Sequence, residues 1–243
     1  MSSKPRVWPD LLSPARSVQF ARMFRHVPNA LTAARLVLAG VFFTMLGYYQ
    51  FEGRGDPLLL NFAFAVYCVA LVTDFLDGYL ARRWRVEGAF GRVVDPFVDK
   101  VLVIGSFIFF AGKNFIIPAS GAGGRGFWVQ TITGVAPWMV VVILARELLV
   151  TSFRGLGEAS GQNFGAAMGG KLKMVFQSVT ILIILVYVNY LQRLRDHGYD
   201  RGATVVRDVF IWLTIAITVI SGLAYVERAV SVYRKGMIQS GGE

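Results

Sequence analysis

Six long apolar stretches separated by short polar segments dominate the chain. They cover residues 29–49, 58–80, 93–111, 134–153, 172–191 and 204–225. Each has about the 20 residues that an α-helix needs to cross the hydrocarbon core of a bilayer. The apolarity is continuous and does not alternate over ten-residue segments, which favours helices over a membrane β-barrel. The pattern therefore predicts an all-α polytopic membrane protein with six transmembrane helices.

Composition supports a membrane protein and argues against several other classes. Of the 243 residues, 55% are hydrophobic and only 16% are charged, and the mean hydropathy is +0.53. An ordinary soluble domain carries more charge. The single cysteine, Cys68, excludes a disulfide framework within one chain. The net charge of +10 comes from cations spread over the ends of the apolar stretches. This distribution favours anionic membrane lipids as partners, and we expect no nucleic-acid partner.

The cations are divided unequally between the two sides of the predicted membrane domain. Of the 25 Lys and Arg residues, 15 lie on the side of both termini, 7 on the other side and 3 within the predicted helices. Because cytoplasmic flanks carry the excess of cations, we expect cytoplasmic termini in a bacterial inner (plasma) membrane. Residues 1–28 form a basic segment, either an interfacial helix or a solvated tail. Residues 29–228 form the predicted membrane domain, and residues 229–243 a cytoplasmic tail.

Four aspartates lie at the junction of the second and third predicted helices. Asp74 and Asp77 are three residues apart, and Asp95 and Asp99 are four apart. Each spacing places two carboxylates on one helix face, and a short connection makes the two helices antiparallel. Four carboxylates in a small volume need compensating cations, and oxygen ligands favour Mg²⁺ or Mn²⁺. Two such ions would bridge a diphosphate at the cytoplasmic edge of the membrane.

Small residues and an arginine beside these carboxylates leave room for a ligand. Gly78 removes a side chain next to the first pair, and Gly91 shares a helical stripe with the second pair. Arg82, one turn after Gly78, can donate parallel hydrogen bonds to phosphate oxygens. A simpler alternative is that the aspartates form surface ion pairs with the neighbouring arginines. That alternative explains the charge but not the paired spacings or the small residues.

Eight fixed positions at characteristic spacings resemble the signature of the CDP-alcohol phosphotransferase family. They are Asp74, Asp77, Gly78, Ala81, Arg82, Gly91, Asp95 and Asp99. The resemblance implies a six-helix membrane fold and a homodimer. It also implies a metal-dependent transfer of a phosphatidyl or related group from a CDP-linked donor to an alcohol.

The resemblance also implies roles for single residues. The implied metal ligands are Asp74, Asp77, Asp95 and Asp99, and Asp99 would in addition be the general base. The implied CDP site consists of Asn29, Gly78, Ala81, Arg82 and Gly91. The segments "NALTAARLVLAG", "VDPFVDK", "LARELLVTSFRG" and "GKLKMVFQ" are most similar to family members that use CDP-diacylglycerol and glycerol 3-phosphate. The resemblance therefore implies phosphatidylglycerol phosphate as the product.

Basic residues at the ends of other predicted helices fall on the same side as the aspartates. The candidates for binding the acceptor phosphate are Arg35, Arg146, Lys171 and Lys173. For Lys171 and Lys173, anchoring at the membrane surface is an alternative. Arg146 could instead pair with Glu147 or with an aspartate, because an unpaired charge within the membrane is costly.

Alternatives in function remain. The same chemistry could use inositol phosphate, serine or phosphatidylglycerol as the acceptor. A membrane prenyltransferase would need a second aspartate-rich motif, but the later segments hold only Asp196, Asp200 and Asp208, near the opposite face. A divalent-cation transporter could use the same carboxylates, but it gives no purpose to the arrangement of Gly78, Arg82 and Gly91.

Overall fold

The structure, a computed structural model, is built from α-helices. It describes residues 27–51, 55–84, 89–116, 131–159 and 168–240, without some side chains near the helix ends. This part of the chain holds six α-helices, a 3₁₀ turn and no β-strand. They are α2 (Val27–Tyr48), α3 (Pro57–Trp84), α4 (Ala89–Phe110), η2 (Lys113–Phe115), α5 (Pro137–Ala159), α6 (Met168–Asp196) and α7 (Asp200–Ser240). The all-α prediction is confirmed.

The predicted apolar stretches each fall largely within one of the helices α2 to α7. The helices are longer than the apolar stretches at several ends, because polar residues continue the helical turns. The largest extension is that of α7, which runs from Asp200 to Ser240 and so continues into the predicted C-terminal tail. Residues 1–26, which include most of the predicted basic N-terminal segment, lie outside the described residues.

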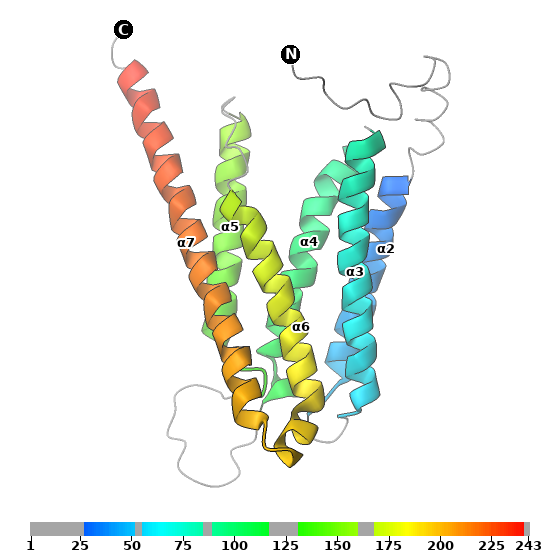
Figure 1. Ribbon diagram of the computed structural model, residues 1–243. Helices are drawn as coiled ribbons and strands as arrows, with labels where there is room; N and C mark the ends of the chain where they lie inside the picture. Colours follow the sequence, from blue (N-terminus) through cyan, green and yellow to red (C-terminus); the bar gives the residue numbers. More distant parts are fainter. Residues whose placement is uncertain (1–26, 52–54, 85–88, 117–130, 160–167, 241–243) are drawn as a thin grey trace, which may run out of the picture.

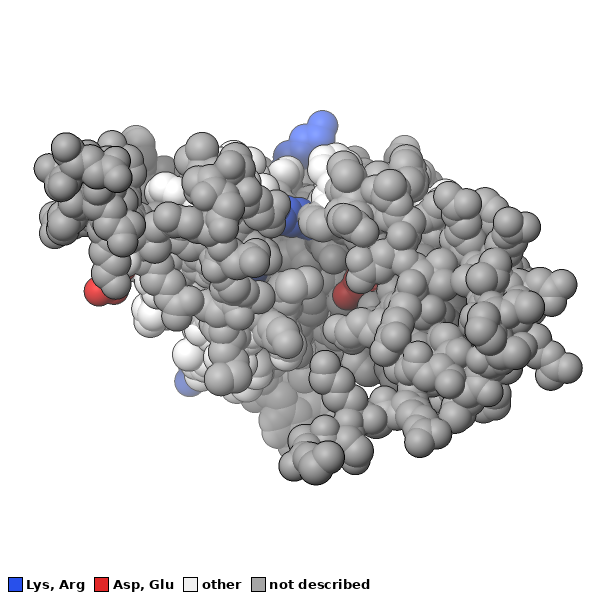
Figure 2. Space-filling model, turned by 90° about the horizontal axis from the view of Figure 1, so that it is seen from above, with Lys and Arg blue, Asp and Glu red and all other residues white. Residues whose placement is uncertain are grey.

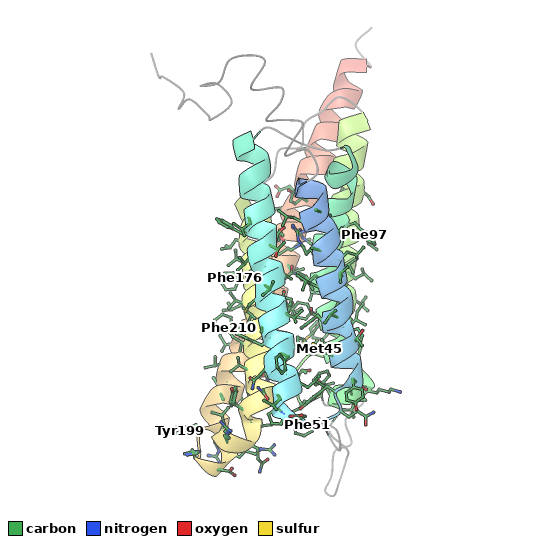
Figure 3. The ribbon with its side chains drawn as sticks, turned by 90° about the vertical axis from the view of Figure 1, so that its right-hand side faces the viewer. Met45, Phe51, Phe97, Phe176, Tyr199 and Phe210 are labelled. Atoms are coloured by element: carbon green, nitrogen blue, oxygen red, sulfur yellow. The ribbon has the colours of Figure 1, made fainter. Side chains whose placement is uncertain are left out.

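The helices run alternately up and down in one bundle (Figure 1). We call the end with the start of α2 and the end of α7 the upper end, and the opposite end the lower end. The ends of α3 and α5 and the starts of α4 and α6 also lie at the upper end. α2 packs against α3 and α4, whereas α6 packs against α3, α4 and α7, and α5 packs against α4 and α7. Figure 3 shows Phe51 and Tyr199 near the lower end and Phe97 nearer the upper end.

Large hydrophobic side chains lie on the outside of the bundle as well as inside it. Phe42 and Phe107 are almost fully buried, whereas Phe62, Phe75 and Ile220 are 63%, 70% and 66% exposed. An apolar surface of this extent is typical of a face that contacts lipid. Four helical segments are long and apolar enough to cross a membrane. They are Ala30–Tyr48, Pro57–Leu76, Leu172–Asp196 and Asp200–Glu227. The fold is that of a polytopic membrane protein.

Candidate active site

The helix ends that carry the four aspartates lie together at the upper end of the bundle (Figure 1). Asp74 and Asp77 belong to the last turns of α3, and Asp95 and Asp99 to the first turns of α4. Of these four side chains, the structure describes that of Asp74. The other predicted site residues whose side chains lie outside the described set are Asn29, Gly78, Ala81, Arg82, Gly91 and Lys171.

Asp74 forms an ion pair with a buried arginine of α2. The distance from Arg35 Nη1 to Asp74 Oδ1 is 2.7 Å. The Arg35 side chain is 2% exposed, whereas that of Asp74 is 39% exposed. The guanidinium therefore holds the carboxylate from the inside of the bundle and leaves part of it accessible. From the sequence, Arg35 was predicted to bind the acceptor phosphate. The structure shows its pair with Asp74, and the role in acceptor binding stays a prediction.

A cavity of about 420 Å³ lies beside the Arg35–Asp74 pair. Aliphatic side chains of α3, α4 and α6 form most of its wall, and Ser178 of α6 adds a hydroxyl. The cavity thus has an ionic end and an apolar wall. Such a cavity suits a ligand with a charged head and a hydrocarbon part.

A buried ion cluster joins α5 to α6 and α7. Arg146 Nη1 lies 3.2 Å from Glu147 Oε1, and Lys173 Nζ contacts the same carboxylate oxygen. Arg146 Nε also donates a hydrogen bond of 3.2 Å to Ser221 Oγ of α7. The side chains of the three charged residues are at most 8% exposed. The alternative prediction that Arg146 pairs with Glu147 is confirmed.

This cluster holds more cations than carboxylates among the described residues. Lys100 of α4 lies close enough to Lys173 for their charges to repel each other. Three cations therefore gather near one carboxylate, that of Glu147. Arg146 Nη2 is buried and has no hydrogen-bond partner in the described part of the chain, and an unsatisfied buried donor costs about 1–3 kcal/mol. An anion bound here would take this donor and balance the charge.

Seen from above, charged atoms are visible near the middle of the upper end (Figure 2). Blue Lys or Arg atoms and a red Asp or Glu group are visible there. The ion cluster and the cavity share one helix, because Lys173 joins the cluster and Met174, the next residue of α6, lines the cavity. The two features therefore meet at neighbouring residues of α6.

Three members of this region were not among the predicted site residues. Glu147 lies at the centre of the ion cluster, and Lys100 Nζ donates a hydrogen bond to Thr151 Oγ1 of α5. Thr151 Oγ1 in turn donates to the Glu147 backbone oxygen at 2.7 Å. A sequence signal existed for Lys100 and Glu147, since each is a charge inside an apolar stretch. Thr151 gives no such signal.

The profile of the family described as CDP-alcohol phosphatidyltransferase matches residues 25–220. The chain belongs to the CDP-alcohol phosphatidyltransferase family. A CDP-diacylglycerol–glycerol-3-phosphate 3-phosphatidyltransferase of Bacillus subtilis is 26% identical over 206 residues, which cover 82% of this chain and 93% of the relative. The Cereibacter sphaeroides protein of the same name is 27% identical, with 84% and 95% covered. A Mycobacterium tuberculosis protein named "Probable phosphatidylglycerophosphate synthase" is 32% identical, with 84% and 81% covered.

The matched region contains every predicted site residue, from Asn29 to Lys173. The resemblance inferred from the aspartate spacing is therefore confirmed, and the chain is an enzyme of the phosphatidyltransferase class. The prenyltransferase alternative also lacks structural support, because Asp196 and Asp200 flank the turn between α6 and α7 at the lower end (Figure 1). Family membership likewise favours the enzyme over the transporter.

Proposed function

We propose that this protein transfers the phosphatidyl group of CDP-diacylglycerol to glycerol 3-phosphate, which gives phosphatidylglycerol phosphate and CMP. The observation that carries the proposal is the pairing of two adjacent features at one end of the bundle. One is the cavity with Asp74 at its ionic end, and the other is the ion cluster with an excess of buried cations. The relatives named for this reaction align with most of the chain.

The donor fits the cavity between α3, α4 and α6. Its apolar wall suits the lipid part of CDP-diacylglycerol, and the open Asp74 carboxylate lies where the diphosphate would bind. A partly exposed, pre-oriented carboxylate fits a hard divalent ion, and Mg²⁺ or Mn²⁺ has the matching preference for oxygen. The proposed metal ligands are Asp74, Asp77, Asp95 and Asp99, and the proposed CDP site consists of Asn29, Gly78, Ala81, Arg82 and Gly91.

The acceptor fits the ion cluster. Arg146 and Lys173 share the single negative charge of Glu147, so the phosphate of glycerol 3-phosphate would add the second negative charge. It would also accept a hydrogen bond from Arg146 Nη2. Arg35 and Lys171 complete the proposed acceptor set. This charge requirement favours a phosphorylated acceptor over serine.

The proposed reaction is a displacement at phosphorus. Asp99 takes the proton from a hydroxyl of glycerol 3-phosphate, and that oxygen attacks the phosphorus that carries diacylglycerol. The bond from this phosphorus to the bridging oxygen breaks, and CMP leaves with the electron pair. When bound, two divalent ions would polarise the diphosphate and offset the charge on the leaving CMP.

We also propose that all six helices cross the membrane, with the upper end and both termini in the cytoplasm of a bacterial inner membrane. α4 and α5 have 22 and 23 residues, so each is about 33 Å long, which is sufficient to cross the hydrocarbon core. The described apolar part of α4 is the shorter segment Lys100–Phe110. The cations at the upper helix ends support this orientation. A homodimer is expected from the family resemblance.

Purified protein with CDP-diacylglycerol and Mg²⁺ or Mn²⁺ tests the reaction. The acceptors to compare are glycerol 3-phosphate, inositol phosphate, serine and phosphatidylglycerol, with CMP release as the rate and mass spectrometry of the lipid as the product assay. We expect phosphatidylglycerol phosphate from glycerol 3-phosphate, at a rate at least about tenfold above the other acceptors, and no turnover after metal chelation. Faster CMP release with another acceptor would contradict the proposed acceptor.

A further inference from the structure

We infer that Lys100 is a further phosphate-binding residue of the acceptor site, and that Thr151 positions its ammonium group. This inference rests on the proposed function, because it assigns Lys100 to the phosphate of the same acceptor. It extends the site to α4, from which no other cation among the described side chains joins the ion cluster. α4 would then carry both the proposed base, Asp99, and a phosphate ligand.

The hydrogen bonds of Thr151 give the Lys100 side chain a defined direction. The Thr151 hydroxyl has one proton, which it donates to the Glu147 backbone oxygen at 2.7 Å. Its lone pairs therefore remain for the Lys100 Nζ group, which contacts Thr151 Oγ1. The lysine consequently reaches from α4 to α5, one turn beyond Arg146 and Glu147.

The charges in this region explain why the lysine is available for an anion. Among the described residues, the Glu147 carboxylate is shared by Arg146 and Lys173. Lys100 contacts a neutral hydroxyl and lies close enough to Lys173 for repulsion. An anion bound near both ammonium groups would offset this repulsion and accept charge-assisted hydrogen bonds from them. A phosphate dianion supplies the two negative charges that Glu147 alone does not.

The position of Lys100 in the chain favours the acceptor phosphate over the donor diphosphate. Lys100 follows Asp99 directly, and its ammonium lies on the α5 side, next to the ion cluster. Glycerol 3-phosphate is a short molecule, so the cations that bind its phosphate must lie near the base that deprotonates its hydroxyl. The donor cavity, in contrast, has Leu102 and Val103 as its α4 residues.

Two measurements on Lys100→Met test the assignment. The first is the affinity for inorganic phosphate, measured by thermal stabilisation of the purified protein without CDP-diacylglycerol. The second is the set of KM values for glycerol 3-phosphate and CDP-diacylglycerol. We expect phosphate affinity to fall about tenfold or more and the KM for glycerol 3-phosphate to rise by a similar factor, as for a lost hydrogen bond to a charged group. The KM for CDP-diacylglycerol should stay within about twofold of that of the wild-type protein.

Thr151 has a matched control in α2. Thr44 Oγ1 makes the same kind of bond to its own helix, at 2.8 Å to the Gly40 oxygen, without a lysine partner. We expect Thr151→Val to raise the KM for glycerol 3-phosphate about threefold, as for a modest loss of positioning. Thr151→Ser, which keeps the hydroxyl, and Thr44→Val should both resemble the wild-type protein. Lys100→Gln replaces Lys100→Met if the methionine variant does not fold.

The outcomes separate this inference from the proposed function. Unchanged phosphate affinity in Lys100→Met overturns the role of Lys100. A rise in the KM for CDP-diacylglycerol alone overturns it as well, because the lysine would then act on the donor. Equal losses in Thr151→Val and Thr151→Ser overturn the positioning role of the hydroxyl. If the wild-type protein binds phosphate through Lys100 but makes no phosphatidylglycerol phosphate, the proposed function fails and the phosphate site stands.

Discussion

Two buried arginines lie toward opposite ends of the bundle, and their surroundings differ. Toward the lower end, Arg207 Nε and Nη2 lie 2.8 and 2.6 Å from Asp208 Oδ1, and Arg207 Nη1 donates to the Ile132 oxygen at 2.7 Å. Its guanidinium also lies 4.5 Å from the centroid of the Tyr187 ring. Arg146 instead shares its carboxylate with a lysine, and its buried Nη2 has no hydrogen-bond partner among the residues that the structure describes.

The difference separates a structural arginine from a functional one. Arg207 has one carboxylate to itself, and its bond to Ile132 fastens the segment before α5 to α7. Its charge and donors are used within the fold, so it contributes to stability. Arg146, in contrast, shares one carboxylate with Lys173, and among the described residues its Nη2 has no hydrogen-bond acceptor. Incomplete surroundings of a buried charge are typical of a site that a ligand completes.

The largest expected effect contrasts Asp99 with Asp208. Asp99→Asn should lower kcat at least about 10³-fold while the protein stays folded, because a general base contributes about 10²–10⁴-fold and Asp99 is also a proposed metal ligand. Asp208→Asn should keep kcat within about twofold, since Asp208 pairs with Arg207 toward the lower end. CMP release measures the rates, and circular dichroism checks the fold. A wild-type rate in purified Asp99→Asn would refute the assignment of the base.

The second prediction exchanges each arginine for methionine. Arg146→Met should raise the KM for glycerol 3-phosphate about 30-fold, as for a lost hydrogen bond to a charged group, with little change in the thermal midpoint. Arg207→Met should leave that KM unchanged and lower the midpoint by about 5 °C, which corresponds to about 2 kcal/mol. Steady-state kinetics and thermal unfolding in detergent measure the two quantities. If both variants raise the KM for glycerol 3-phosphate, or both lower the thermal midpoint, the distinction between a functional and a structural arginine is wrong.

The sequence alone was sufficient for the all-α fold and for the family, and the physical reasons are local. Apolar stretches of membrane-spanning length predict helices, and the aspartates that point to the family lie within 26 residues of each other, from Asp74 to Asp99. The ion cluster depends instead on residues far apart in the chain. Whether Lys171 or Lys173 reaches Glu147 depends on the rotation of α6 against α5. Local spacing does not determine that rotation.

Arg207 is a second example of this limit. In the sequence it is one of seven cations on the side opposite the termini of the predicted membrane domain. Its partner, the Ile132 backbone oxygen, is 75 residues away. A backbone acceptor has no signature in a sequence, so the structural role of Arg207 could not be predicted.

The third prediction concerns the shared carboxylate. Glu147→Gln leaves Arg146 and Lys173 without a neutralising anion, so the thermal midpoint should fall by about 5 °C, or about 2 kcal/mol. Added inorganic phosphate should restore more of the midpoint in this variant than it adds to the wild-type protein, because phosphate replaces the missing charge. Asp208→Asn is the control and should show no extra response to phosphate. An equal rise of the thermal midpoint with phosphate in both variants would show that the two ends of the bundle do not differ in their response to phosphate.

The smallest expected effect tests the lower end by itself. Gly134 has a φ of +75°, and a Cβ at this position would lie 2.8 Å from Arg207 Nε. Gly134→Ala should therefore cost about 1 kcal/mol in backbone strain, or about 3 °C in the thermal midpoint, and displace the guanidinium. Gly40→Ala in α2 is the control, since a Cβ there meets nothing within 4 Å and alanine favours a helix. Neither variant should change the KM for glycerol 3-phosphate, and a rise in Gly134→Ala would make Arg207 part of the site.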